Sequence, residues 1–201
     1  PNPLDPGMKI GILAVQGAVG LHADALDRCG VATVEVRTVE QLGDIDGLIM
    51  PGGESTTMSM LLERTGLFDA LARRIDGGLA VFGTCAGMIL LAIRVEGGRA
   101  DQRSFGAIDI DVERNGYGRQ RESFEAPIDL GDDADPFPGV FIRAPRVLRT
   151  GPAVEVLARL DDTPVLARSG SVLVSSFHPE LSGELRLHQR FLALAEANHH
   201  R

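Results

Sequence analysis

Apolar residues in the first half of the chain form short continuous runs that alternate with stripes of helical spacing. Continuous runs predict buried strands, and apolar residues three and four positions apart predict helices. The predicted strands cover residues 9–15, 31–37, 47–50 and 79–82, and the predicted helices cover residues 18–29, 56–64, 68–75 and 86–93. This order is typical of βαβ units, so we expect an α/β fold of three layers around a central, mostly parallel sheet.

The second half of the chain predicts short strands separated by turn residues, followed by one last helix. The expected strands are 108–113, 124–128, 140–142, 154–160, 165–167 and 172–176, and the helix covers 183–198. Segment 129–138 is acidic and contains prolines, which predicts a surface loop. In the helix at 18–29, one face is expected to carry the apolar side chains Ala18, Leu21, Ala25 and Cys29.

Composition narrows the possible functions. The chain has 201 residues, a net charge of −8 and no cluster of basic residues. An acidic chain of this kind is a poor candidate for binding nucleic acid or an anionic membrane. Residues 1–7 hold three prolines and no periodicity, and we expect an N-terminal extension before a single domain over 8–201. Two cysteines form neither a disulfide framework nor a zinc site, which favours a cytoplasmic location.

The strongest chemical signal is the motif GTCAG at 83–87, between a predicted strand and a predicted helix. This arrangement is typical of a nucleophile elbow, in which flanking glycines allow a tight turn that projects the central side chain. The helix N-terminus behind Cys85 favours a thiolate and offers backbone N–H groups to an oxyanion. The alternative interpretation is a small buried cysteine in a tight turn.

A thiolate nucleophile needs a base, and His178 is the best candidate of the five histidines. It follows the strand predicted at 172–176, where ligands bind in parallel sheets. Glu180 points to the same side in extended geometry and is placed to orient the imidazole. His22 and His188 fall within predicted helices, where a solvated or helix-packing role is the default.

The motif PGGEST at 51–56 also follows a predicted strand. Its glycines allow the backbone to approach a ligand closely, so the N–H groups of Gly53 and Ala86 are expected to form an oxyanion hole. The motif lacks the lysine and spacing of a phosphate-binding loop. The alternative interpretation is that Ser55 or Thr56 caps the following helix, and this role is compatible with an oxyanion hole.

Taken together, these motifs resemble the class I glutamine amidotransferase family, and within it the glutaminase subunits of pyridoxal 5'-phosphate synthase. The matching segments are AVQGAV at 14–19, PGGESTTM at 51–58, FGTCAG at 82–87, ERN at 113–115, YGRQ at 117–120, FIRAP at 141–145 and SFHPE at 176–180. The similarity extends from residue 9 to about residue 191, and segment 94–103 matches nothing.

The resemblance implies roles for individual residues. It assigns the nucleophile to Cys85, the base to His178 and the orienting carboxylate to Glu180. The implied glutamine contacts are Gly53, Glu54, Ser55, Arg114, Ile142 and Arg143. A cationic donor and an acceptor suit the α-carboxylate and α-ammonium of free L-glutamine.

The implied reaction is hydrolysis of glutamine to glutamate and ammonia, without a metal or organic cofactor. The resemblance also implies a protein partner, a synthase subunit in a large hetero-oligomer that uses the ammonia to make pyridoxal 5'-phosphate. The alternatives are a glutaminase for another amidotransferase, a non-catalytic binding module, and a cysteine hydrolase of the α/β-hydrolase type. That last class places its acid before the histidine, whereas Glu180 follows His178 here.

Overall fold

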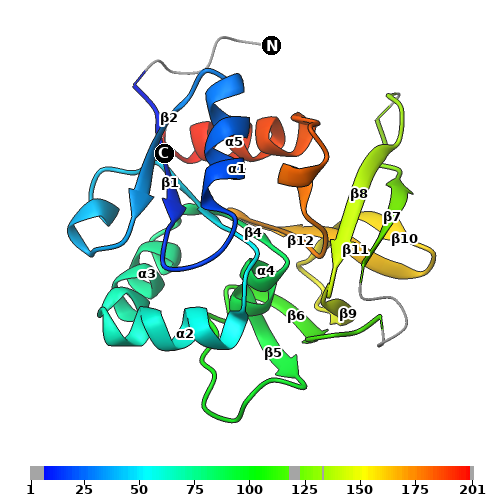
Figure 1. Cartoon of the computed structure of the whole chain (residues 1–201), viewed down its shortest axis with the longest axis horizontal. Coiled ribbons are helices and arrows are strands. Elements are labelled where there is room, and N and C mark those ends of the chain that lie inside the picture. The colour runs from blue at the N-terminus through cyan, green and yellow to red at the C-terminus, as the bar shows by residue number, and fades with distance from the viewer. Residues whose placement is uncertain (1–6, 118–122, 133, 200–201) are drawn as a thin grey trace.

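A seven-stranded sheet in the order β10-β11-β12-β4-β3-β1-β2 forms the centre of the computed structural model, which describes residues 7–117, 123–132 and 134–199 (Figure 1). Its strands are β1 (Lys9–Leu13), β2 (Ala32–Val36), β3 (Gly47–Met50), β4 (Ala80–Thr84), β10 (Glu155–Leu160), β11 (Thr163–Ser169) and β12 (Val172–Ser175). Strands β2, β1, β3, β4 and β12 pair in parallel, and β11 and β10 continue the sheet antiparallel. The prediction of a mostly parallel sheet is therefore confirmed.

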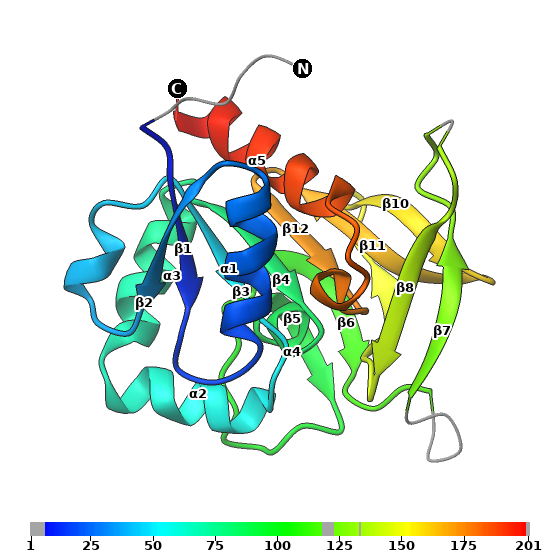
Figure 2. The ribbon, with the colours of Figure 1, turned by 45° about the horizontal axis from the view of Figure 1, so that its top comes forward.

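Helices cover both faces of this sheet (Figure 2). One face carries α1 (Val19–Arg28) and α5 (Arg186–His199), and the other carries α2 (Ser55–Arg64), α3 (Leu67–Asp76) and α4 (Ala86–Leu91). Two short 3₁₀ helices complete the described helical segments, η1 (Glu40–Leu42) and η2 (Pro179–Leu181). Within the described ranges, no helix is both long and apolar enough to cross a membrane. Residues 1–6 of the predicted extension lie outside the described residues.

Two smaller sheets lie beside the central one. Strands β5 (Ala92–Glu96), β6 (Ile108–Glu113) and β9 (Arg146–Thr150) form the first, and β7 (Ser123–Ile128) with β8 (Phe137–Ile142) form a hairpin. The helix predicted at 86–93 is too long, because the backbone becomes extended at Ala92, with ψ of 151°, and that residue pairs with Ile108. Strands β5 and β9 were not predicted.

Segment 94–103, which matched nothing, combines the end of β5 with a loop that packs on α2 and α3. Arg103 exchanges hydrogen bonds with the Ser59 hydroxyl and lies 3.9 Å above the ring centroid of Phe68. The Thr56 hydroxyl donates to the Gln102 side chain at 3.1 Å. These contacts fasten the loop to the helix that follows the PGGEST motif.

The prediction of a surface loop over 129–138 is wrong at its end, because β8 begins at Phe137. Every second residue of this strand is buried, and the Phe137 ring is fully enclosed, with its centroid 5.7 Å from that of Phe177. The error arose because exposed positions alternate with buried ones in such a strand. The exposed Pro138 and the acidic residues before Phe137 made the start of the strand look like part of the loop.

The buried face of α1 also differs from the prediction. His22, Ala25 and Leu26 are buried, whereas Leu21 remains 42% exposed. The helix turns His22 inward because a buried partner, His188 of α5, receives it there. A histidine thus occupies a position at which an apolar residue was expected.

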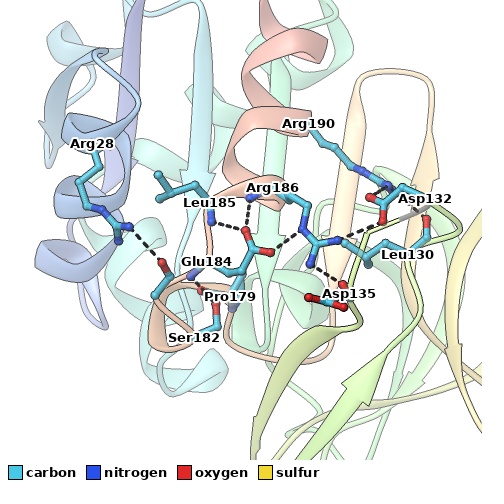
Figure 3. A network of polar contacts seen from close by, with 11 residues as sticks. Arg28, Leu130, Asp132, Asp135, Pro179, Ser182, Glu184, Leu185, Arg186 and Arg190 are labelled. Atoms are coloured by element: carbon cyan, nitrogen blue, oxygen red, sulfur yellow. Dashed lines mark hydrogen bonds and ion pairs between the residues drawn. The ribbon is translucent and has the colours of Figure 1, made fainter. Parts of the chain in front are cut away.

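Salt bridges and hydrogen bonds fasten the start of α5 to the acidic loop (Figure 3). Arg186 binds the carboxylate of Asp132 at 3.0 Å and the carbonyl oxygen of Asp135 at 2.8 Å, and Arg190 binds Asp132 at 3.0 Å. Arg28 of α1 donates to the carbonyl oxygen of Gly183 at 3.1 Å. The segment between η2 and α5 is therefore held from both sides.

Replacing Phe137 by alanine tests whether β8 begins inside the core. Phe137→Ala is expected to lower the free energy of unfolding by about 3–5 kcal/mol, because a fully buried ring is lost. Urea denaturation measures the change. Met60→Ala, at a side chain that is 46% exposed on a helix, serves as the control and should change stability by no more than about 0.5 kcal/mol. Equal effects of the two substitutions would contradict the assignment.

Candidate active site

Four segments of the site follow neighbouring parallel strands and therefore meet at one edge of the sheet. Gln16 follows β1, Gly52 and Gly53 follow β3, Cys85 follows β4 and His178 follows β12. They surround a cavity of about 430 Å³. Its lining residues are Gln16, Gly52, Gly53, Glu54, Ser55, Cys85, Ala86, Ile89, Arg114, Asn115, Ile142, Arg143 and His178.

Cys85 stands at a sharp turn between β4 and α4, with φ of 50° and ψ of −104°. A side chain at positive φ is strained, and the surrounding packing must hold it there. Close backbone contacts require both flanking glycines: a Cβ at Gly87 would lie 2.1 Å from the carbonyl oxygen of Met50, and one at Gly83 would lie 2.7 Å from the carbonyl carbon of Gly87. The predicted elbow conformation is therefore present.

His178 links Cys85 to Glu180. Its Nδ1 lies 2.7 Å from Oε1 of Glu180, whose side chain is fully buried. Since an ionised carboxylate only accepts, Nδ1 carries the hydrogen and Nε2 is left for the thiol side. The η2 turn that begins directly after His178 brings Glu180 behind the ring, rather than the extended geometry expected from the sequence.

The pKa values of this pair move in opposite directions. Burial alone would lower the pKa of His178, but hydrogen bonding and charge from Cys85 and Glu180 raise it to about 10. Burial opposes ionisation of Glu180, yet the hydrogen bond and charge of His178, with a contribution from His22, hold its pKa below the usual value. His178 is consequently an imidazolium and Glu180 a carboxylate at neutral pH.

Two backbone N–H groups were predicted to form the oxyanion hole. Ala86 is the first residue of α4, so its N–H has no partner within the helix. The carbonyl oxygen of Gly52 accepts a hydrogen bond from the N–H of Ala18 at 3.3 Å. Because a trans peptide is planar, this bond turns the N–H of Gly53 away from the β1–α1 loop. Both residues line the cavity, and their role in catalysis stays a prediction.

Glu54 and Arg114 form an ion pair at the cavity. Glu54 also accepts hydrogen bonds from the N–H groups of Thr56 and Thr57, so Glu54 caps α2 instead of the predicted Ser55 or Thr56. Its longer side chain folds back over the first turn, which satisfies two helix N–H groups at once. The Ser55 hydroxyl is buried without a hydrogen-bond partner among the described residues.

The β7–β8 hairpin supplies the opposite wall through Ile142 and Arg143. The sulfur of Cys85 lies 3.7 Å from the carbonyl oxygen of Ile142. Arg143 has φ of 44°, a second strained residue beside the cavity. All six residues that the resemblance implied as glutamine contacts thus line the same cavity as Cys85 and His178.

Gln16 is a residue of this cavity that was not predicted from the sequence. Its side-chain oxygen accepts a hydrogen bond from the N–H of Glu54 at 2.8 Å and it lines the cavity. Its position directly after a predicted buried strand was the available signal. Within the YGRQ motif, Tyr117 lies in the described part of the chain, whereas residues 118–120 lie outside it.

The sheet topology, with Cys85, His178 and Glu180 together at one edge, is that of the class I glutamine amidotransferases. The chain belongs to the SNO glutamine amidotransferase family, whose model matches residues 12–197. This match covers both the elbow cysteine and the late histidine.

Relatives of known name are similar over nearly the whole chain. A pyridoxal 5'-phosphate synthase subunit PdxT from Thermotoga sp. (strain RQ2) is 51% identical over 190 residues, which are 94% of this chain and 100% of the relative. The subunit of the same name from Pelotomaculum thermopropionicum is 53% identical over 188 residues, 92% of this chain and 94% of the relative.

Solved structures agree with this assignment. The crystal structure of a glutamine amidotransferase has a TM-score of 0.87 at 50% identity and covers 92% of this chain and 98% of its own. The structure of PurLQS from Thermotoga maritima has a TM-score of 0.65 at 16% identity, covering 97% of this chain and 100% of its own, and supports the fold alone.

The spacing between Gly52 and the triad generates a test. A Cβ at Gly52 would lie 2.4 Å from Cε1 of His178, so Gly52→Ala must displace the imidazole. Turnover of glutamine is expected to fall about 100-fold, since a misplacement of about 1 Å costs that much. Steady-state glutamate release measures it. Gly20→Ala is the matched control, because no atom lies within 4 Å of its added Cβ. Wild-type turnover in Gly52→Ala would contradict the geometry.

Proposed function

We propose that this chain hydrolyses L-glutamine as the glutaminase subunit of a pyridoxal 5'-phosphate synthase. The observation that carries the proposal is the cysteine elbow facing the His178–Glu180 pair. It occurs in a chain that is 51% identical to a PdxT subunit over the full length of that relative. The site belongs to a domain that we take to cover residues 8–201.

In the first half-reaction, the Cys85 thiolate attacks the side-chain amide carbon of glutamine. The N–H groups of Gly53 and Ala86 stabilise the negative charge that develops on the amide oxygen. The imidazolium of His178 gives its proton to the nitrogen as the carbon–nitrogen bond breaks, and ammonia leaves. The product on the enzyme is a γ-glutamyl thioester at Cys85.

The second half-reaction returns the site to its starting state. Neutral His178 takes a proton from water, and the hydroxide attacks the thioester carbon. The carbon–sulfur bond breaks, releasing glutamate and the thiolate, while His178 is again an imidazolium. Glu180 remains ionised throughout and keeps the Nδ1 proton of His178 in place.

Substrate recognition uses the cavity wall around the ion pair of Glu54 and Arg114. Arg114 and Arg143 bring positive charge to the place where an α-carboxylate needs it, and Glu54 offers an acceptor for the α-ammonium. Ser55 and Ile142 complete the set of cavity-lining residues that we assign to the substrate.

The ammonia passes to a synthase subunit that assembles pyridoxal 5'-phosphate. The relatives named as subunits of this synthase support the partner, and an open cavity at the sheet edge supports exchange with it. We place the reaction in the cytoplasm, where the thiols of Cys29 and Cys85, both free in the structure, stay reduced.

Replacing the nucleophile tests the proposal directly. Cys85→Ala is expected to fold normally and to release no glutamate above background, with or without the synthase subunit, because no thioester can form. A glutamine analogue bearing an electrophile should modify Cys85 in the wild-type chain. Cys29→Ala is the matched control and should keep full activity and labelling. Labelling at Cys29 alone, or turnover by Cys85→Ala, would sink the assignment.

The raised pKa of His178 predicts the alkaline limit of activity. Its protonated form, which donates to the departing ammonia, persists up to a pKa of about 10 and is lost above it, so kcat should fall as the pH rises through that value. Glu180→Gln removes a charge that raises this pKa and should move the alkaline limb to lower pH.

The comparison of the two proteins isolates this effect, because the ammonium group of glutamine titrates alike in both assays. The kcat of each protein is measured across the alkaline range at saturating glutamine. An alkaline limb at the same pH in both proteins would show that Glu180 does not set the protonation of His178.

A further inference from the structure

The second oxygen of Glu180 faces a histidine that the mechanism does not use. Oε1 binds His178, whereas Oε2 lies 3.4 Å from Nε2 of His22 and has no hydrogen-bond partner among the residues that the structure describes. Both side chains are fully buried. A buried carboxylate oxygen without a donor is costly, so the neighbouring imidazole is the group that compensates it.

His22 is itself held by His188. Nδ1 of His22 lies 3.0 Å from Nε2 of His188, and both residues are fully buried between α1 and α5. The hydroxyl of Thr84, the residue before the nucleophile, lies 3.4 Å from Nε2 of His22. Buried contacts therefore run from His188 through His22 and Glu180 to His178 and the cavity.

Burial keeps the two outer histidines neutral. It lowers the pKa of His188 to about 3, and it lowers the pKa of His22 despite the attraction of Glu180. The charged groups that act on this pair are the Glu180 carboxylate, the His178 imidazolium and, for His188, the Arg28 guanidinium. Each neutral ring carries one hydrogen, so the contact between them contains only one.

The hydrogen positions follow by elimination. A hydrogen on Nδ1 of His22 would leave a bare lone pair on Nε2 that faces the Glu180 carboxylate, with the Thr84 hydroxyl to donate to it. It would also leave a buried N–H at Nδ1 of His188, which has no partner within the described part of the chain. A hydrogen on Nε2 of His188 instead directs the Nε2–H of His22 toward Glu180. In the second arrangement Nδ1 of His188 is an unpaired acceptor instead of an unpaired donor, and the Nε2–H of His22 is attracted to the Glu180 carboxylate instead of a lone pair being repelled by it. The second arrangement therefore costs less.

We infer that His22 is a positioning residue for the triad: its Nε2–H edge, 3.4 Å from Oε2, attracts the Glu180 carboxylate so that Oε1 stays on His178. His188 acts one step further out, by fixing the ring and tautomer of His22. The role of the triad itself rests on the proposed glutamine hydrolysis. Removing the hydrogen-bonded partners behind metal ligands typically changes activity by about 10- to 100-fold, and we take the same range for His22.

Two amide substitutions separate positioning from packing. In His22→Gln the amide nitrogen reaches the place of Nε2 and can still donate to Glu180, whereas the shorter side chain of His22→Asn reaches only the place of Nδ1. We expect His22→Asn to lower kcat about 10- to 100-fold with little change in KM, and His22→Gln to stay within about threefold of wild type. Both variants keep a buried polar group in α1.

A second measurement does not require glutamine. The rate at which iodoacetamide alkylates Cys85 is measured in a Cys29→Ser background, since it reports how well His178 supports the thiolate. His22→Asn should slow alkylation about tenfold and His22→Gln should not. Leu26→Ala, a buried change one turn along α1, is the control: it should lower the unfolding temperature and leave the alkylation rate of the folded protein unchanged.

Equal rates in His22→Asn and His22→Gln, or an equal slowing by Leu26→Ala, would overturn the inference. If His22→Asn fails to fold, His188→Leu takes its place. It should slow alkylation by freeing the His22 ring, and a wild-type rate there would also overturn the inference. Absence of glutamine hydrolysis in the wild-type chain with its synthase partner would refute the proposed function alone, because the alkylation comparison still stands.

Discussion

The contact between α4 and β3 is the constraint on which the catalytic arrangement depends. Gly87 packs so closely on the carbonyl oxygen of Met50 that any side chain there would push the helix off the sheet. With α4 this close, the chain has only one residue in which to turn from β4 into the helix, and Cys85 takes the strained conformation. The strain is offset by the buried apolar surface of α4, all six residues of which are enclosed.

The parallel pairing on both sides of β4 then brings the remaining groups to Cys85. The N–H of Cys85 donates to the carbonyl oxygen of Ser175 at 2.8 Å, which fixes the register of β12 and so the position of His178. His178 is tied in turn to β8, because its N–H donates to the carbonyl oxygen of Val140 at 2.8 Å. The β7–β8 hairpin, which ends at Ile142 and is followed by Arg143, is thereby positioned by the segment that carries His178.

Much of the fold and of the candidate site could be predicted from the sequence. The pattern of apolar residues marks the buried strands, and the residues directly after those strands mark the site. Strand β3 at Gly47–Met50 and strand β6 at Ile108–Glu113 match their predicted ranges, and the elbow needed only its glycines. Strands β5 and β9 were missed because only one residue of each is buried, so neither a continuous apolar run nor a regular alternation marks them. The inward turn of His22 had no sequence signal, because its partners lie on α5 and η2 and only tertiary packing brings them together.

The arrangement of His178, His22 and His188 near Glu180 explains why only one of the three rings is protonated at neutral pH. Burial disfavours the charged form of all three rings, but hydrogen bonding and charge from Cys85 and Glu180 outweigh it at His178 and raise its pKa. His22 shares Glu180 but also faces the charge of His178, which lowers its own pKa, and His188 lies one ring further away. The proton is therefore confined to the ring that reaches the cavity. Placing neutral rings behind Glu180 keeps the carboxylate supported without adding a second cation that would weaken its hold on His178.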